Sequence, residues 1–167
     1  MSERERQSVH VEETDVQSGF LCDEPELTRF FLEQALKFEK SGFARTYVVR
    51  RDADDPADFP PVLGYYTICM ARVNTAELPE KIGTLEPNSP PALPAALLGR
   101  MARDQRVPRG LQLGEWLVGH SARRSVCSLD ALGTRCRHRH RIYRLRSSRA
   151  FPRSGTGYET RAASRIR

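Results

Sequence analysis

The stretch AALLGRMARDQRVPRGLQLGEWLVGH, residues 95–120, decides the fold because it holds three elements in succession. Ala95–Arg103 is an apolar run of strand length and predicts a β-strand. Asp104–Gly114 contains proline and glycine and predicts a short loop. The next apolar positions recur at i, i+3, i+4 and i+7, which predicts a helix with one apolar face: Leu113, Trp116, Leu117 and His120.

A strand, a glycine-containing loop and a helix in this order form a candidate phosphate site. The loop can direct several backbone N–H groups at one point, and the helix N-terminus adds about half a positive charge. Glycine is needed where a side chain would block the approach of the backbone to an anion. Short glycine motifs also occur by chance, so an ordinary turn between strand and helix is an equally good interpretation of the loop alone.

The residues before this stretch predict a helix and two strands. Asp23 as N-cap, Pro25 in the first turn and Glu26 three residues after the cap predict a helix start. Gly42 predicts its end. The apolar face of this helix comprises Leu27, Phe30, Phe31, Ala35 and Phe38. Strands are expected at Phe43–Arg51 and Val62–Val73, a short edge strand within Val9–Val16, and a connection with at most one helical turn at Asn74–Pro94.

This order of elements, and the residues within them, resembles the GNAT acetyltransferase family and specifically its TacT-like toxin branch. The matching pieces occur in the family's order over roughly residues 9–124 and are Phe20–Cys22, Leu27–Leu32, Gly42–Val49, Val62–Thr67, Leu97–Asp104 and Gly110–Leu117. The resemblance implies an α/β fold of the GNAT type, a mixed and mostly antiparallel sheet flanked by helices. It also implies acetyl-CoA as co-substrate.

The family's loop pattern, Arg/Gln-x-x-Gly-x-Gly/Ala, is matched at Arg109 and Gly114 but carries Gln112 in place of its middle glycine. A Cβ there crowds the pyrophosphate or forces a costlier backbone angle. The resemblance implies that the pyrophosphate of acetyl-CoA lies over Arg109, Gly110, Leu111, Gln112, Leu113 and Gly114. It implies that the pantetheine arm pairs with the strand backbone at Met101, Ala102 and Arg103.

The catalytic acid cannot be assigned from the sequence. In the family an Ala-Phe-Tyr-like motif follows the loop helix, and its tyrosine is thought to protonate the leaving thiolate. Here Phe151 is followed by Pro152 where the tyrosine would stand. Tyr143 and Tyr158 are substitutes by residue type only.

The C-terminal third differs from the rest in charge and pattern. Residues 1–120 hold 14 Lys and Arg against 19 Asp and Glu, whereas residues 121–167 hold 13 Arg and two acidic residues. From about Ser121 we expect no helix or strand that could bury a face. The chain is therefore divided into a frayed N-terminus (1–8), a partial GNAT domain (9–124) and an Arg-rich, disordered tail (125–167).

Two hypotheses account for this tail. A shifted reading frame from about Ser121 would explain the abrupt loss of hydrophobic periodicity. The alternative is a genuine basic extension, which could bind RNA through its arginines. Sequencing the gene and its downstream frames distinguishes them. The set Cys127, Cys136, His138 and His140 does not have the usual spacing of a zinc site, so no metal is expected.

The resemblance implies a toxin that acetylates the α-amine of an aminoacyl-tRNA and so blocks translation. Its implied partner is a ribbon-helix-helix antitoxin, and a homodimer stays open. Two alternatives remain, an inactive remnant that only binds the antitoxin and a basic nucleic-acid-binding module. No apolar run of about 18 residues occurs and the N-terminus leads into no apolar segment, so we expect no membrane span and a cytoplasmic protein.

The remaining side chains of interest have ordinary interpretations. His10 and His120 have no partner nearby in the sequence, and a surface or core role is expected for each. Tyr65 and Tyr66 alternate across a strand. One ring should lie in the core, and the other either lines the acceptor cleft or, as we prefer, also packs in the core.

Overall fold

A computed structural model describes residues 6–77 and 90–131, all within one compact unit. Its described strands form one antiparallel sheet in the order β1-β2-β3-β4. The strands are β1 (Val9–His10), β2 (Arg45–Arg50), β3 (Val62–Asn74) and β4 (Ala92–Arg103). The α/β fold expected from the sequence is confirmed.

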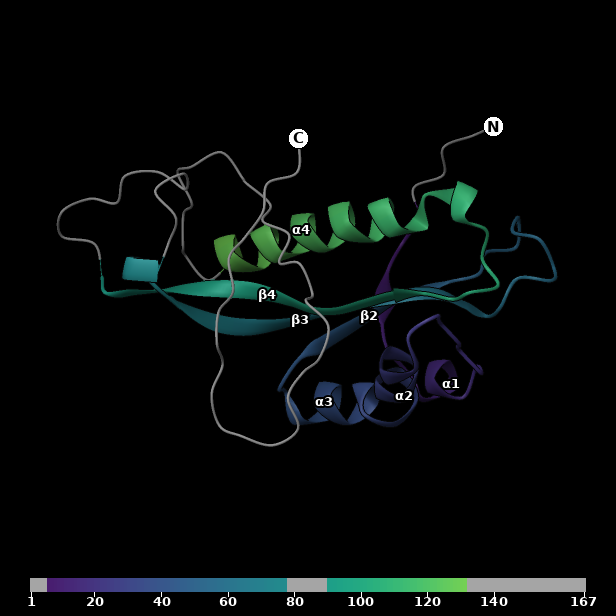
Figure 1. The fold of residues 1–167 in the computed structure, drawn as a ribbon, viewed down its shortest axis with the longest axis horizontal. Coiled ribbons are helices and arrows are strands. Elements are labelled where there is room, and N and C mark those ends of the chain that lie inside the picture. Colours follow the sequence, from purple (N-terminus) through teal and green to yellow (C-terminus); the bar gives the residue numbers. More distant parts are fainter. Residues whose placement is uncertain (1–5, 78–89, 132–167) are drawn as a thin grey trace. The chain divides into compact units, whose positions relative to one another are not determined.

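Helices cover both faces of the sheet (Figure 1). The first face carries α1 (Glu13–Val16), α2 (Pro25–Glu33) and α3 (Ala35–Ser41), and the second carries α4 (Leu113–Ala131). Because side chains alternate along a strand, each face of the sheet builds its own core. None of the helices in the described part is long and apolar enough to cross a membrane.

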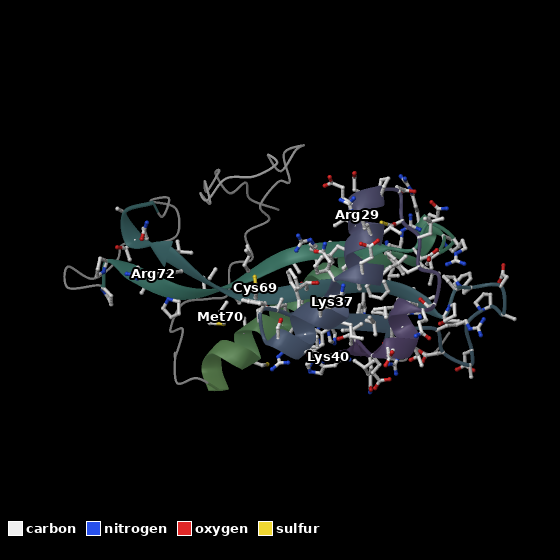
Figure 2. All side chains as sticks on the ribbon, turned by 90° about the horizontal axis from the view of Figure 1, so that it is seen from below. Arg29, Lys37, Lys40, Cys69, Met70 and Arg72 are labelled. Carbon is white, nitrogen blue, oxygen red and sulfur yellow. The ribbon has the colours of Figure 1, made fainter. Side chains whose placement is uncertain are left out.

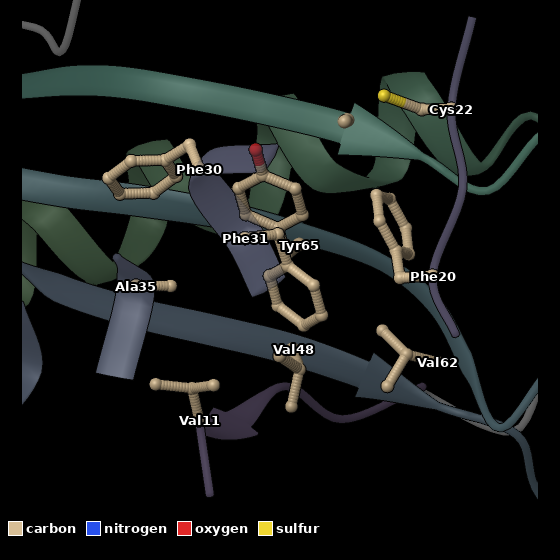
Figure 3. Close-up of a cluster of buried hydrophobic side chains, with 10 residues drawn as sticks. Val11, Phe20, Cys22, Phe30, Phe31, Ala35, Val48, Val62 and Tyr65 are labelled. Atoms are coloured by element: carbon tan, nitrogen blue, oxygen red, sulfur yellow. The ribbon is translucent and has the colours of Figure 1, made fainter. Parts of the chain in front are cut away.

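The core under α1–α3 is rich in aromatic rings (Figure 3). Tyr65 stacks on Phe31 with ring centroids 4.7 Å apart. The ring centroid of Phe20 lies 4.9 Å from that of Phe31 and 5.4 Å from that of Tyr65. The core under α4 contains Tyr66, Leu63 and Leu117, each at most 1% exposed. Tyr65 and Tyr66, adjacent in sequence, therefore belong to opposite cores, and the acceptor-cleft interpretation of the second ring is wrong.

The first predicted helix is two helices with a different cap. Its N-cap is Glu24 rather than Asp23, and the Glu24 side chain forms no capping hydrogen bond, so the expected capping box is absent. The helix breaks at Gln34, which is both the C-cap of α2 and the N-cap of α3. Gly42, with φ of 75°, ends α3 as expected.

The strand predictions hold with shifted ends. Val9 and His10 of the expected edge strand pair with β2, and Val11 donates its N–H to the carbonyl of Thr46 at 3.0 Å. The strand ends there because Glu12 and Asp15 cap each other reciprocally and start α1. In the described part of the connection Asn74–Pro94, Thr75–Glu77 form a 3₁₀ turn. Strand β4 begins earlier than predicted and includes Pro94, which the end strand of the described sheet tolerates.

Helix α4 continues past Ser121, where we expected regular structure to stop. Ser121 is 2% exposed and its hydroxyl donates to the carbonyl of Val118 at 2.9 Å. The guanidinium of Arg124 lies 4.3 Å from the ring centroid of Tyr47. Polar side chains thus cover the sheet here, and a search for apolar periodicity alone misses them. The tail beyond Ala131 lies outside the described residues.

Candidate active site

The end strand β4 presents an open edge. In the register between β3 and β4, Met101, Ala102 and Arg103 lie opposite Tyr66, Tyr65 and Gly64 respectively. Asp104 donates its backbone N–H to the carbonyl of Leu63 at 2.8 Å. Because the direction of the backbone groups alternates along a strand, the N–H and C=O of Ala102 face β3 as well. The backbone groups of Met101 and Arg103 then face away from β3, where the described sheet has no further strand.

The loop after β4 leads directly into the N-terminus of α4. Arg109–Leu111 form a 3₁₀ turn, and Gln112 accepts the first helical hydrogen bond from the N–H of Trp116 at 3.1 Å. An α-helix leaves its first N–H groups without an intrahelical acceptor, here those of Leu113, Gly114 and Glu115. A Cβ added to Gly110 or Gly114 would meet no atom within 4 Å, so the loop is open to solvent.

Gln112 adopts the left-handed conformation that the family's glycine would occupy. Its φ is 49° and its ψ is 25°, and it is the only described residue other than glycine with positive φ. A non-glycine residue in this region costs roughly 1–2 kcal/mol. The costlier backbone angle expected from the sequence is therefore present.

Asp104 fixes the loop to a distant part of the chain. Its carboxylate is fully buried and accepts bonds from the backbone N–H of Leu21 at 3.0 Å and of Arg106 at 2.9 Å, as well as from the Arg106 guanidinium. Burial alone would raise the pKa of Asp104, but these hydrogen bonds outweigh it and hold the pKa below its ordinary value. This role of Asp104 is not evident from the sequence, because one of its partners, Leu21, lies 83 residues away in the chain.

Gly64 lets α4 approach the sheet. A Cβ at Gly64 would lie 2.9 Å from the carbonyl oxygen of Ala102 and 3.1 Å from Cδ1 of Leu117. The first turns of α4 are therefore held against β3 by contacts that only glycine permits. This packing places the helix N-terminus at the end of β4, beside the open edge.

Two arginines at the loop differ in how firmly they are held. Arg106 bonds the buried Asp104 and the carbonyl of Gly19 at 2.9 Å, so its guanidinium serves the scaffold. The Arg109 side chain is 86% exposed, and the ion pair that its guanidinium forms with the exposed Asp23 is long, at 3.8 Å. An exposed pair of this kind contributes little. Arg109 is therefore available to an anion at the helix N-terminus.

His120 lies in a polar network under α4. Its Nδ1 lies 3.1 Å from the Tyr66 hydroxyl and 3.2 Å from the Ser8 hydroxyl, and its ring stacks on Trp116 at 4.4 Å. Burial raises the pKa of Tyr66. His10 also has a partner, since its Nδ1 lies 3.0 Å from the Glu39 carboxylate. Both histidines thus have structural partners that only the tertiary fold supplies.

The other sequence candidates lie outside the described residues. These are the tyrosines considered for catalysis, the position aligned with the family's motif, and three of the four Cys and His residues considered for zinc: Tyr143, Tyr158, Phe151, Pro152, Cys136, His138 and His140. Cys127 alone is described, and its side chain is exposed.

The strand edge, the glycine-containing loop and the helix N-terminus thus lie together at one end of the described sheet. No family model matches the chain. The chain is 29% identical over 125 residues to a tRNA-acetylating toxin of Mycobacterium tuberculosis, covering 75% of this chain. It is 31% identical over 101 residues to a probable TacT toxin of Sinorhizobium fredii, covering 60% of this chain. It spans 69% of the first relative's length and 52% of the second's.

Solved toxin structures share the fold. AtaT complexed with acetyl-methionyl-tRNAfMet is 25% identical with a TM-score of 0.59, covering 76% of this chain and 72% of that one. AtaTR bound with acetyl-CoA is 26% identical with a TM-score of 0.58 and the same coverage of both chains. An AtaT mutant bound to acetyl-CoA and the C-terminus of antitoxin AtaR is 22% identical, with a TM-score of 0.57, and covers 78% of this chain and 71% of that one. The chain is thus related to GNAT-type toxins in sequence and shares their fold.

Proposed function

We propose that the protein is an acetyl-CoA-dependent N-acetyltransferase whose acceptor is the α-amine of an aminoacyl-tRNA. The observation that carries the proposal is the open edge of β4 leading into the N-terminus of α4. The similarity to a tRNA-acetylating toxin, and to toxins solved with acetyl-CoA and with an acetylated charged tRNA, supports this choice of substrates.

Each part of the site has one task in this proposal. The N–H and C=O groups of Met101 and Arg103 pair with the amide groups of the pantetheine arm. The N–H groups of Leu113, Gly114 and Glu115 hold the pyrophosphate, with Arg109 as an added cation. Acetyl-CoA supplies the activated acyl group. The neutral amine attacks the thioester carbonyl, and a strand N–H donates to the oxygen that gains negative charge. Collapse of this tetrahedral intermediate forms the amide and breaks the C–S bond, and CoA leaves as a thiolate that takes up the proton lost by the amine.

We further propose an antitoxin partner of the ribbon-helix-helix type and a cytoplasmic place of action, where charged tRNA and acetyl-CoA are both present. Support for a protein partner comes from the AtaT structure that contains a segment of antitoxin AtaR. Acetylation of the α-amine would remove the nucleophile needed for peptide-bond formation. The expected consequence is a block of translation.

Two measurements test the proposal. Calorimetry with acetyl-CoA tests donor binding, and transfer of labelled acetyl to charged tRNA, with uncharged tRNA as control, tests the reaction. Binding with transfer supports the enzyme, whereas binding without transfer supports an inactive remnant. If acetyl-CoA does not bind, the acetyltransferase assignment fails.

A matched pair of variants tests the location of the pyrophosphate. Gly114→Glu places a carboxylate at the N-terminus of α4, and Gly119→Glu places the same group further along the same helix. A Cβ at either glycine meets no atom within 4 Å. We expect G114E to weaken acetyl-CoA binding at least about tenfold by charge repulsion and G119E to leave it within about twofold. Equal effects would argue against this site.

A further inference from the structure

Arg100 is a cation held on an aromatic face beside the proposed acyl site. It belongs to β4, one residue before Met101. Its guanidinium carbon lies 4.0 Å from the ring centroid of Phe30, and that ring is itself 3% exposed. Phe30 sits beside Phe31 and Tyr65 in the aromatic core, as Figure 3 shows. A cation stacked on a ring keeps its N–H donors in the plane of the guanidinium and directed away from the ring.

Arg100 shares its contact with an aromatic face with Arg124, which lies over Tyr47 and also donates to the carbonyl of Ser8, and it differs from the arginines that bond carboxylates. Arg6, Arg45, Arg50 and Arg106 each bond a carboxylate, of Asp55, Glu39, Asp15 and Asp104 respectively. In residues 6–77 and 90–131, no carboxylate forms a salt bridge with Arg100. Contact with the Phe30 ring therefore holds the guanidinium in place without pairing its charge with a carboxylate. Such a group is suited to a planar, bidentate bond with an oxyanion.

The position of Arg100 along β4 indicates which anion it meets. The pyrophosphate of the donor lies at the α4 N-terminus, beyond Arg103 in the proposed site. The pantetheine arm then runs back along the open edge, so the acyl group lies toward Arg100. An anion at Arg100 must therefore come from the second substrate. In an aminoacyl ester of a 3′-terminal ribose, the nearest anion is the phosphate of the terminal nucleotide.

We propose that Arg100 binds the phosphate of the 3′-terminal nucleotide and thereby delivers the α-amine to the thioester. The inference rests on the proposed function and assigns a residue to its acceptor. Arg29 precedes Phe30 in α2 and is exposed on the same side of the sheet, where Figure 2 also shows Lys37 and Lys40 on α3. These cations can attract the rest of a nucleic-acid backbone without the orientation that stacking gives Arg100.

The test compares acceptors with and without the phosphate. Arg100→Met keeps an unbranched side chain over Phe30 and removes the charge, and Arg72→Met is the matched control on an exposed position of β3. With charged tRNA we expect R100M to raise KM at least about tenfold while KM for acetyl-CoA stays unchanged. With 3′-aminoacyl adenosine, which lacks the 5′-phosphate, R100M should behave like the unsubstituted protein. R72M should change the acceptor KM by less than about twofold.

Direct binding keeps this inference separate from the proposed function. The affinity for charged tRNA is measured over a range of salt concentrations, with no acetyl-CoA present. R100M should weaken binding and lower the slope of log affinity against log salt by about 0.7 relative to R72M, as for one lost contact to a single-stranded phosphate. This result stands even if no acetyl transfer is detected, in which case only the proposed function fails.

The inference is overturned if R100M and R72M bind charged tRNA alike, or if R100M loses activity equally with both acceptors. Equal losses would mean that Arg100 only supports the packing of α2 on β4. If R100M does not fold, Arg100→Lys replaces it, because lysine keeps the charge but cannot form the bidentate bond. R100K should then show an intermediate KM for charged tRNA and an unchanged KM for aminoacyl adenosine.

Discussion

The two faces of the sheet stabilise the protein in different ways. The face under α1–α3 is filled by packed aromatic rings and holds more of the buried aromatic side chains than the other face. The face under α4 mixes apolar packing with the Ser8–Tyr66–His120 network, and the helix covering it forms part of the proposed donor site. The comparison indicates that one face mainly supplies stability and the other mainly positions the site. Substitutions can test this division.

The largest effect on stability is expected from Phe31→Ala. Phe31 is fully buried and contacts Phe20 and Tyr65 through its ring. Removal of a buried phenyl ring costs about 3–5 kcal/mol of unfolding free energy. Urea denaturation checks this value, and acetyl-CoA affinity of the folded fraction should be unchanged. If fully folded F31A lost acetyl-CoA affinity, the aromatic face would also be needed to position the site, and the proposed division between the two faces would be contradicted.

Gly64→Ala should affect both stability and the site. The new Cβ would lie 2.9 Å from the carbonyl of Ala102, and the side chain of Leu117 would have to move. Overpacking of this kind costs about 1–3 kcal/mol. Because α4 must shift, we also expect weaker acetyl-CoA binding. Thermal unfolding and calorimetry on the same sample measure both effects. Gly99→Ala is the control, since its Cβ would only reach ordinary contact at 3.9 Å.

Acid should weaken the attachment of the loop through Asp104. The folded pKa of Asp104 is lowered, so its carboxylate stabilises the fold fully above the unfolded pKa of about 3.9. This contribution is lost as the pH falls from there through the folded pKa. Arg6 likewise lowers the pKa of Asp55, so protonation of Asp55 adds to the loss of stability in acid. The unfolding free energy, measured from pH 6 into the acid range, should fall less steeply in Asp104→Asn than in the unsubstituted protein. An unchanged slope would show that Asp104 does not contribute to the acid sensitivity.

The smallest expected change is a gain from Gln112→Gly. Glycine relieves the left-handed strain of about 1–2 kcal/mol but loses backbone entropy of about 0.5–1 kcal/mol, so the net gain is about 0.5–1 kcal/mol. Acetyl-CoA affinity should also rise, because the Cβ no longer crowds the pyrophosphate. Gln112→Ala keeps the Cβ and should show neither change. Equal melting temperatures and equal acetyl-CoA affinities of Q112G and Q112A would mean that the left-handed backbone conformation of Gln112 costs no free energy.

The elements that local pattern specifies were predictable from the sequence. Leu113 and Leu117 marked the start of α4, and Gly42 marked the end of α3, because spacing and left-handed preference are local properties. The break at Gln34 was not predictable, since the apolar spacing runs through it. The continuation of α4 past Ser121 was missed because Arg124 covers the sheet by stacking on Tyr47, and a polar side chain carries no apolar period.

The residues of the candidate site likewise divide into those that a local motif predicts and those whose role depends on distant partners. The loop Arg109–Gly114 and the strain at Gln112 followed from the motif, because both depend on backbone conformation near the chain position itself. Asp104 and Gly64 lie within stretches that resemble the family, but their roles in fixing the loop and in admitting α4 are not evident from the sequence. Their partners, Leu21 and Leu117, are far away in the chain, so only the folded structure brings them together.

The bonds from the loop to Gly19 and Leu21 also set the order in which the protein becomes active during synthesis. The guanidinium of Arg106 bonds the carbonyl of Gly19 across 87 residues, and Gln105 donates to the carbonyl of Leu21 at 2.8 Å. Contacts this distant in sequence close late, because chain entropy must be overcome first. A nascent chain on the ribosome therefore lacks a formed donor loop until the segment around Arg106 has emerged and met residues made much earlier. The proposed donor loop therefore cannot form until the ribosome has made the segment around Arg106.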